Sequence, residues 1–358
     1  MKKLPSISLL FMFLPCHSKA QKLNDFADSI RIAYHIPEIA FAVVSADSVH
    51  EMRTIGYKKI NSNLAATIYD RFRIGSNTKA ITGFIAALLV KEGKITWETK
   101  FFELYPELKA KSDPAYHDLT LLNLLSFRAR LFPYTYTYAR PAKNQFKGNE
   151  EKQRYQFATW FFQQKPVGKR DTIIFSNLGF IAAGLMLEKA SGKTYEQLVK
   201  DLGSQLDIRF AFGQPNTENS SQTWGHDEHL KPEAPGDSYK LNWLLPAGNI
   251  NVSLPDYTKF IQLQLRGLQG KSTLLSKDEF NFMHYGLSKF SVGWFWETDE
   301  NGRIFSYNVG NPGTFLSKVY IFNKENKAFI LLCNVQNDEA EEGIDNLYDH
   351  LKKMYIKP

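Results

Sequence analysis

The apolar run from Thr78 to Glu92 restricts the possible folds of this chain more than any other segment. Nearly every position in it is apolar, so a helix formed there is hydrophobic on all sides, and Gly93 marks its end. A helix of this kind belongs in the interior of a large domain. The chain can supply that interior, because 43% of its 358 residues are hydrophobic and only 23% are charged. No segment is apolar and long enough to predict a membrane-spanning helix.

The remaining hydrophobic patterns place the expected strands near the two ends of the chain. Alternating apolar residues and the Asn301-Gly302 turn signal indicate antiparallel strands. The expected strands are residues 39–45, 49–57, 290–296, 304–309, 315–322 and 328–334, and amphipathic helices are expected at 23–34 and 338–354. The simplest packing joins all the strands in one antiparallel sheet flanked by the N- and C-terminal helices, which makes the fold class α/β.

The middle of the chain predicts a second, mostly α-helical lobe inserted into this arrangement. One apolar helix is expected at 178–190, and another begins near Pro255. The predicted α/β lobe covers about residues 21–80 and 288–358, and the helical lobe covers about 81–287. The two lobes form a single domain, and their junction is the natural place for a cleft.

The first 20 residues resemble a secretory signal peptide. Lys2 and Lys3 form a basic start, Leu9 to Leu14 an apolar centre, and Ser18 to Ala20 a small-x-small cleavage site. We therefore expect an exported protein, periplasmic or extracellular, whose mature chain covers residues 21–358.

The two cysteines and the net charge limit the expected anchoring and partners. Cys16 allows a lipoprotein as the less favoured alternative, because Phe13 and Pro15 fit poorly around a lipid-accepting cysteine. Cys333 remains alone after cleavage, so it cannot form an internal disulfide. Cleavage removes three lysines and no acidic residue, and the formal net charge falls from +7 to +4. Such a mild excess does not indicate nucleic-acid binding.

Ser76 and Lys79 form the one S-x-x-K pattern in the chain, at the start of the apolar helix. A serine hydroxyl is a weak nucleophile and needs a base within hydrogen-bond reach. Residues three apart in a helix lie on the same face, and an apolar helix desolvates the ammonium, which lowers its pKa. The helix N-terminus also favours a developing oxyanion. The pattern predicts a nucleophile and its base; the alternative is a serine at a helix start beside a surface lysine.

Several further motifs occur in the order known from one enzyme superfamily. They are Leu119–Ser126, Phe175-Ser176-Asn177, Ser191-Gly192-Lys193, Pro246-Ala247-Gly248, Ser253–Asp256 and Asn308–Gly313. Together with Ser76 and Lys79, they make the chain similar to the serine β-lactamase-related superfamily. The resemblance is strongest to class C β-lactamases, D-Ala-D-Ala carboxypeptidases and related esterases, which share the penicillin-binding-protein fold. It covers nearly the whole mature chain.

The resemblance implies a role for each matching residue. Ser76 would be the nucleophile and Lys79 its base partner, while Asn177 would reach both the substrate and Lys79. The alternative for Asn177 is a structural helix N-cap. The strand from Asn308 to Gly310 would flank the substrate, and the backbone N–H groups of Ser76 and Asn311 would form the oxyanion hole.

Two positions on the substrate side of the site depart from the family pattern. Phe175 stands where the family usually has Tyr, and Asn308 stands where it usually has Lys or His. We still expect Phe175, Asn308 and Gly310 to bind substrate, but without a proton-transferring hydroxyl and without a cation for a substrate carboxylate. Loss of a proton-transfer group typically costs about 10²–10⁴ in rate. Six nearby residues can supply a hydroxyl or a charge, or can be purely structural: Tyr134, Tyr136, Tyr138, Tyr307, Arg128 and Arg130.

Two functions remain open on these grounds. The first is an exported serine hydrolase that acts through a Ser76 acyl-enzyme on a β-lactam, a D-Ala-D-Ala peptide, or a small ester or amide. Because Asn308 replaces the usual cation, we rank β-lactamase activity below esterase or peptidase activity. The second is a catalytically impaired pseudoenzyme that binds cell-wall peptide or β-lactam-like ligands in the cleft.

The expected partner in both cases is a small molecule or peptide, including one derived from peptidoglycan. Neither function needs a cofactor or a metal. The run from His226 to His229 resembles a ligand cluster, but it has no third ligand and no helical H-E-x-x-H frame. We interpret it as a polar loop.

Overall fold

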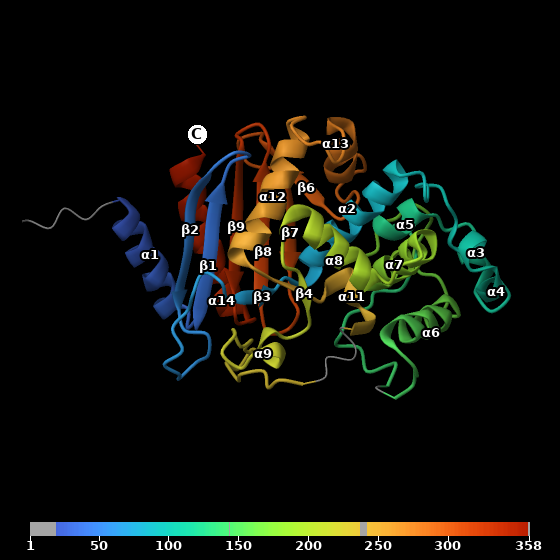
Figure 1. The fold of residues 1–358 in the computed structure, drawn as a ribbon, viewed down its shortest axis with the longest axis horizontal. Coiled ribbons are helices and arrows are strands. Elements are labelled where there is room, and N and C mark those ends of the chain that lie inside the picture. The colour runs from blue at the N-terminus through green and yellow to red at the C-terminus, as the bar shows by residue number, and fades with distance from the viewer. Residues whose placement is uncertain (1–18, 143, 237–241, 357–358) are drawn as a thin grey trace, which may run out of the picture.

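A six-stranded antiparallel sheet forms one side of the molecule in the computed structural model, which describes residues 19–142, 144–236 and 242–356 (Figure 1). The strand order is β2-β1-β9-β8-β7-β6, and every neighbouring pair is antiparallel. The strands are β1 (Glu38–Val44), β2 (Val49–Gly56), β6 (Phe295–Thr298), β7 (Ile304–Gly310), β8 (Leu316–Phe322) and β9 (Lys327–Cys333). The predicted antiparallel sheet is confirmed.

Helices cover both faces of this sheet, which explains why β1 is buried along its whole length. α1 (Lys19–Ala33) and α14 (Asp338–Tyr355) pack against each other on one face, as predicted, and α12 (Leu254–Leu268) contacts β1 and β9 on the other (Figure 1). Alternate side chains of β1 enter the two cores. Phe41 lies in the core beneath the terminal helices, and Ala42 lies in the larger core on the opposite face.

The expected signal peptide, residues 1–20, lies outside the described residues apart from its last two positions, and Cys16 lies outside them too. α1 begins at Lys19, earlier than the predicted residue 23. Across the described part of the chain, no helix is both long and apolar enough to cross a bilayer.

Three short strands that the sequence patterns did not predict form a separate sheet, whereas every predicted strand segment joins the six-stranded sheet. β5 (Ile250–Ser253) lies between β3 (Arg71–Arg73) and β4 (Ala211–Phe212), with antiparallel pairing on both sides. Each strand is too short to leave a period-2 pattern. Their pairing joins segments that are distant in sequence, and local hydrophobic patterns do not predict such pairing.

The strand predicted at 290–296 was also wrong in its bounds, because only β6 forms there. Gly293 has φ +82°, outside the β region, and an ideal Cβ on it would lie 2.5 Å from the Lys79 carbonyl oxygen. The glycine therefore lets this turn approach the backbone of the apolar helix. Val292 and Trp294 are buried because the turn packs into the core, and their alternation does not reflect a strand.

The helical lobe is built around α2 (Thr78–Lys91) and α7 (Asn177–Ser191), which pack against each other. α2 is buried continuously from Thr78 to Ala87, which confirms the interior position predicted for it. The other helical elements of the described chain are α3 (Phe101–Leu104), α4 (Pro106–Lys109), α5 (Leu121–Leu125), α6 (Glu150–Phe162), α8 (Tyr195–Leu206), α9 (Pro215–Glu218), α11 (Leu245–Gly248), α13 (Lys277–Tyr285) and the 3-10 turns η1 (Gly75–Asn77) and η2 (Pro114–Tyr116).

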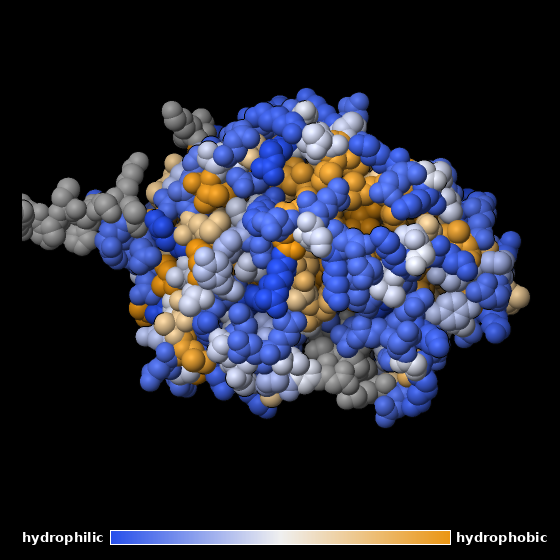
Figure 2. All heavy atoms as spheres, viewed as in Figure 1, coloured by the Kyte–Doolittle hydropathy of each residue, from blue (hydrophilic) through white to orange (hydrophobic). Residues whose placement is uncertain are grey.

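Apolar packing continues from α2 to α13, where the ring centroids of Phe84 and Phe280 lie 5.8 Å apart. The face of the molecule in Figure 2 is mostly hydrophilic, and hydrophobic residues show mainly in the area that α2 and α13 occupy in Figure 1. α2 is therefore held by apolar contacts from several elements, which fixes the position of its first turn.

Gly83→Ala is expected to destabilise the protein by about 1–3 kcal/mol, the usual cost of overpacking a core. An ideal Cβ on Gly83 would lie 2.7 Å from the Val292 carbonyl oxygen, so the helix or the turn must shift. Urea unfolding of both proteins measures the difference. Glu92→Ala, on the exposed end of the same helix segment, is the control and should change the free energy by less than about 0.5 kcal/mol. Equal stability of Gly83→Ala and wild type would contradict this packing.

Candidate active site

Ser76 lies in η1, the tight turn that joins β3 to α2. Gly75 precedes it with φ +49°, and an ideal Cβ on Gly75 would lie 2.8 Å from the backbone nitrogen of Asn311. A side chain there would collide with the segment that follows β7. The glycine therefore brings the Ser76 turn against the end of the large sheet, although the two segments are far apart in sequence.

The Lys79 ammonium is buried directly beside the Ser76 hydroxyl. Its Nζ donates to Ser76 Oγ at 2.8 Å and to the carbonyl oxygen of Ala247 at 2.8 Å, and Lys79 is only 3% exposed. Burial lowers the pKa of Lys79 to about 7, because neither hydrogen-bond partner carries a charge that would favour the ammonium. A neutral amine is therefore accessible near neutral pH, and it lies within reach of the serine proton.

Asn177 begins α7 and lines the same pocket as Ser76. Its Nδ2 donates to the Tyr134 carbonyl oxygen at 2.9 Å, and no hydrogen bond within the described ranges joins it to Lys79. The N-cap of α7 is Ser176, whose hydroxyl accepts from the Leu178 N–H at 3.3 Å. The alternative role of Asn177 as the N-cap was therefore wrong, and its side chain is placed beside the nucleophile.

A narrow pocket of about 20 Å³ lies over Ser76. Ser76 and Asn311, whose backbone N–H groups are the predicted oxyanion hole, both line it. The Ser76 N–H belongs to the first turn of a helical segment, where N–H groups have no intrahelical acceptor. Tyr136 and Asn177 complete the polar part of the lining.

The three residues predicted to bind substrate do not line this pocket in the described structure. Asn308 is 1% exposed, and its Nδ2 donates to the Gly293 carbonyl oxygen at 2.8 Å. Gly310 packs its Cα against the backbone of the turn before Ser76. Phe175 is 58% exposed and contacts Phe127 edge-on and Phe295 at a tilt, with ring centroids 5.4 and 5.6 Å away.

Among the four tyrosines considered as hydroxyl donors, the structure brings Tyr136 into the Ser76 pocket. The Tyr134 hydroxyl donates to the Arg140 carbonyl oxygen at 3.1 Å, and the Tyr307 hydroxyl donates to Glu297 at 2.8 Å. Tyr138 is 43% exposed. Tyr136 is therefore the residue placed to act on a group bound to Ser76.

The two arginines considered as replacement cations lie outside the pocket. Arg128 donates to the carbonyl oxygens of Ser126, Ser288 and Phe290 at 2.9 Å, so its guanidinium joins its loop to the segment before β6. Arg130 lines a different depression with Lys100 and Arg170. Neither guanidinium faces Ser76.

Sequence reasoning missed two groups that shape the site. Ala247 supplies the second acceptor for Lys79, and the only signal for it was the Pro246-Ala247-Gly248 motif. Arg73 is fully buried near Tyr136, with Nη1 3.4 Å from Glu233 Oε2. Burial raises the pKa of Tyr136, and the nearby Arg73 charge opposes that rise. The position of Arg73 between the apolar residues Phe72 and Ile74 was the signal for this buried charge.

A larger, acidic pocket adjoins the Ser76 pocket and shares Tyr136 and Asn311 with it. Its volume is about 670 Å³. Its acidic lining residues are Asp227, Glu228, Asp338 and Glu339, and no lysine or arginine of the described chain contributes to it. The approach to Ser76 on this side is therefore negatively charged.

The His226–His229 run contributes to this pocket without forming a metal site. His226 is buried, with Nδ1 2.7 Å from the Asn334 carbonyl oxygen and Nε2 accepting from the Ile60 N–H at 3.1 Å. Within the ranges that the structure describes, no group of three or more His, Cys, Asp or Glu side chains is arranged to hold a metal ion.

Comparisons with known proteins identify the family. The Beta-lactamase family model matches residues 20–353. Protein flp from Staphylococcus aureus strain MW2 is 21% identical over 329 residues, which cover 90% of this chain and 64% of flp. The unguisins hydrolase ungD' from Aspergillus campestris is 26% identical over 181 residues, 48% of this chain and 32% of that protein. This chain therefore spans less than two thirds of these relatives.

The fold is shared with a solved structure. The octameric penicillin-binding protein homologue from Pyrococcus abyssi superposes with a TM-score of 0.77 at 17% identity, over 94% of this chain and 77% of that one. This match confirms the predicted fold class, an antiparallel sheet with terminal helices and an inserted helical lobe.

Lys79→Met is expected to stabilise the fold, and the gain should depend on pH. The folded state lowers the pKa of Lys79 from 10.5 to about 7, so between these values the unfolded chain binds the extra proton. Wild-type stability therefore rises with pH across this window, and the penalty is fully present below pH 7. Thermal unfolding should show a higher Tm for Lys79→Met near pH 7 and a shrinking difference towards pH 10.

Lys91→Met, at the exposed end of α2, is the matched control and should show no such trend. A Lys79→Met effect that is the same at both pH values would contradict a buried, desolvated amine.

Proposed function

The chain belongs to the Beta-lactamase family, whose activity is of the serine hydrolase type, and we propose that Ser76 acts here as a nucleophile that forms a covalent acyl-enzyme. The observation that carries this proposal is the 2.8 Å hydrogen bond between Lys79 Nζ and Ser76 Oγ inside a buried site. A buried lysine whose hydrogen-bond partners are both neutral does not stabilise the fold. A functional need for a neutral amine beside the hydroxyl explains why it is there.

The proposed reaction follows from this geometry. The neutral Lys79 amine takes the Ser76 proton as Oγ bonds to the substrate carbonyl carbon, and the carbonyl oxygen becomes an oxyanion. The N–H groups of Ser76 and Asn311 stabilise that charge. Collapse of the intermediate breaks the bond to the leaving group, which takes the proton held by Lys79, relayed through the Tyr136 hydroxyl. Water then attacks the Ser76 ester while the neutral Lys79 amine takes its proton, and Lys79 returns that proton to Oγ when the ester bond breaks.

Tyr136 is the group best placed to replace the hydroxyl that Phe175 lacks. It lines the pocket with Ser76 and Asn177, and its hydroxyl packs against Gly313 of the strand-end motif. The buried Arg73 nearby favours the ionised phenol, against the effect of burial. In the proposal, Tyr136 passes a proton to the leaving group.

The proposed substrates are esters, amides or peptides without a carboxylate next to the scissile bond. Asn308 uses its amide on Gly293, so the position where the family usually presents a cation offers none. The adjoining pocket is acidic, which further disfavours an anionic substrate. β-Lactams of the penicillin type and D-Ala-D-Ala peptides carry such a carboxylate and are ranked lower. We also propose export, on the basis of residues 1–20 alone.

One observation favours the alternative of a pseudoenzyme that binds ligand without turnover. The pocket over Ser76 has room for only about 20 Å³, far less than the roughly 300–1,000 Å³ of typical ligand sites. A site this narrow must widen, through movement of Tyr136 or its loop, before an acyl group fits. If it does not widen, the protein retains only a binding role.

A fluorophosphonate probe is expected to label wild-type protein at one site, and Ser76→Ala should remove the label. A fluorescent penicillin, which carries a carboxylate, should react more slowly. The fluorophosphonate rate should rise about tenfold per pH unit below pH 7 and level off above it, because only the neutral Lys79 amine accepts the proton. Intact-mass spectrometry measures the adducts.

Ser76→Ala labelled as fast as wild type would rule out this nucleophile. An ester probe that acylates Ser76 once and is never released would favour the pseudoenzyme.

Tyr136→Phe is expected to lower the rate of ester turnover by about 10²–10⁴, the usual effect of losing a proton-transfer group. The substitution removes only the hydroxyl and should leave the Tm unchanged. Tyr138→Phe, in the same loop and 43% exposed, is the matched control and should turn over at the wild-type rate. Equal rates for Tyr136→Phe and wild type would remove Tyr136 from the reaction.

A further inference from the structure

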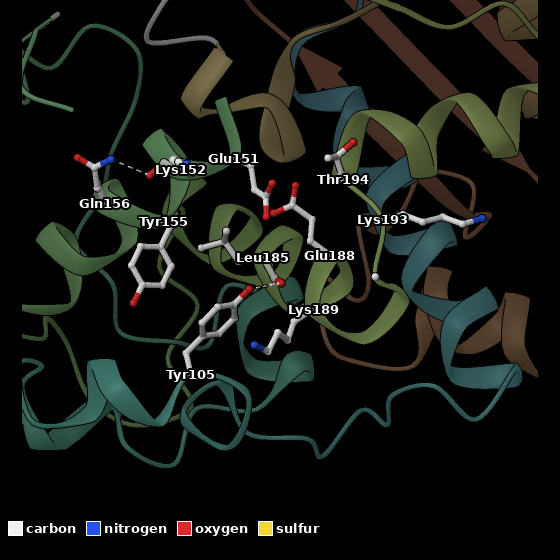
Figure 3. Close-up of a pocket in the computed structure, with 11 residues that line it drawn as sticks. Tyr105, Glu151, Lys152, Tyr155, Gln156, Leu185, Glu188, Lys189, Lys193 and Thr194 are labelled. Atoms are coloured by element: carbon white, nitrogen blue, oxygen red, sulfur yellow. Dashed lines mark hydrogen bonds between the residues drawn. The ribbon is translucent and has the colours of Figure 1, made fainter. Parts of the chain in front are cut away.

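A second pocket lies on the helical lobe and shares no residue with the Ser76 pocket in the described structure (Figure 3). Its volume is about 490 Å³. Tyr105 and Tyr155, with ring centroids 5.8 Å apart, form its aromatic side, and Leu185 lies on its floor. The carboxylates of Glu151 from α6 and Glu188 from α7 point towards each other across it (Figure 3).

The buried charges behind this pocket do not balance. Arg154, which is fully buried, donates to Glu196 at 2.7 and 2.9 Å and to Glu188 Oε1 at 2.6 Å. One guanidinium offsets one carboxylate, so the ionised Arg154–Glu188–Glu196 group carries one negative charge in excess. Glu196 receives the two-point contact, and the excess charge therefore falls on Glu188.

Glu188 presents an oxygen without a partner to the pocket. The residue is 5% exposed, and its Oε1 accepts from Arg154 and from the Tyr195 N–H at 2.8 Å. Its Oε2 is buried and has no hydrogen-bond partner among the described residues. A buried carboxylate oxygen left without a donor is costly. Burial also raises the pKa of Glu188 despite the Arg154 charge. A cation bound in the pocket would remove this cost.

The walls of the pocket indicate which kind of cation fits. Within the described ranges, no set of three or more His, Cys, Asp or Glu side chains is arranged to hold a metal ion. Lys152, Lys189 and Lys193 also line the pocket, but Lys193 is paired with Asp201 at 2.7 Å, and Lys189 and Lys193 point away from the two carboxylates (Figure 3).

The tyrosine wall favours an organic cation. Tyrosine rings attract ammonium groups, and Lys189 Nζ already lies 5.6 Å from the ring centroid of Tyr105. We propose that this pocket binds an organic ammonium group, with Glu188 Oε2 accepting its N–H and the Tyr105 and Tyr155 rings packing along its carbon chain.

The proposed site is independent of the chemistry at Ser76. Asn177 and Glu188 lie on the same helix, α7, but are separated by roughly 16 Å along its axis at 1.5 Å per residue. Ammonium binding should therefore survive in Ser76→Ala. A lysine side chain of a peptide and an amino sugar share the required chemistry, and the two are distinguished below by separate probes.

The test is a calorimetric titration of the whole protein with Nα-acetyl-lysine methylamide and, separately, with glucosamine. At least one of them should bind saturably, with a Kd in the millimolar range or below. The one that binds identifies the source of the ammonium. Their acetylated forms, Nα,Nε-diacetyl-lysine methylamide and N-acetylglucosamine, lack the ammonium and should bind at least tenfold more weakly.

Glu188→Gln should weaken binding of the ammonium probe at least tenfold, because it removes the charge and keeps the size of the side chain. Glu151→Gln is exposed, should leave the fold intact, and should weaken binding about threefold or more. Glu92→Gln, an exposed acid elsewhere on the lobe, is the matched control and should bind as wild type. Equal binding of acetylated probes, wild-type affinity in both pocket variants, or no saturable binding of either probe would each overturn the proposal.

Discussion

The proposed chemistry depends on the burial of one ammonium group beside one hydroxyl. Lys79 can lose its water only because α2 is enclosed on all sides, and Ser76 is held against it by the turn that opens that helix. The close approach of Gly293 to the Lys79 backbone and of Gly75 to the sheet leaves little room for the helix to move. The apolar core therefore serves the site directly, because it sets both the position and the charge state of the amine.

The sequence predicted the parts of this arrangement that repeat locally. The all-round apolar pattern of α2 identified an interior helix, and the spacing of Ser76 and Lys79 indicated that the two side chains meet. The second sheet and the true bounds of β6 were not predictable in this way. They depend on pairing between distant segments and on the positive φ of Gly293, which leave no periodic signal.

The departures from the family pattern acquire a physical meaning in the structure. Asn308 is an internal residue bonded to Gly293, so the lost cation is not replaced at that position. Tyr136 stands in the pocket, while Phe175 packs outside it on other aromatic rings. Choosing Tyr136 from four candidate tyrosines needed coordinates, because residues so close in a loop have no sequence feature that shows which one faces Ser76. The acidic pocket beside the nucleophile also needed coordinates, because its residues come from separate segments of the chain.

The most direct measurement is the titration of the Lys79 amine itself. In protein labelled with ¹³C at lysine Cε, the Lys79 signal can be assigned by its absence from the Lys79→Met spectrum, and its shift can be followed from about pH 5 to 11. The account predicts a midpoint near 7, well separated from the ordinary lysines near 10.5. A Lys79 midpoint at the ordinary lysine value would show that the ammonium is solvated and would contradict the proposed role of this residue as the base for Ser76.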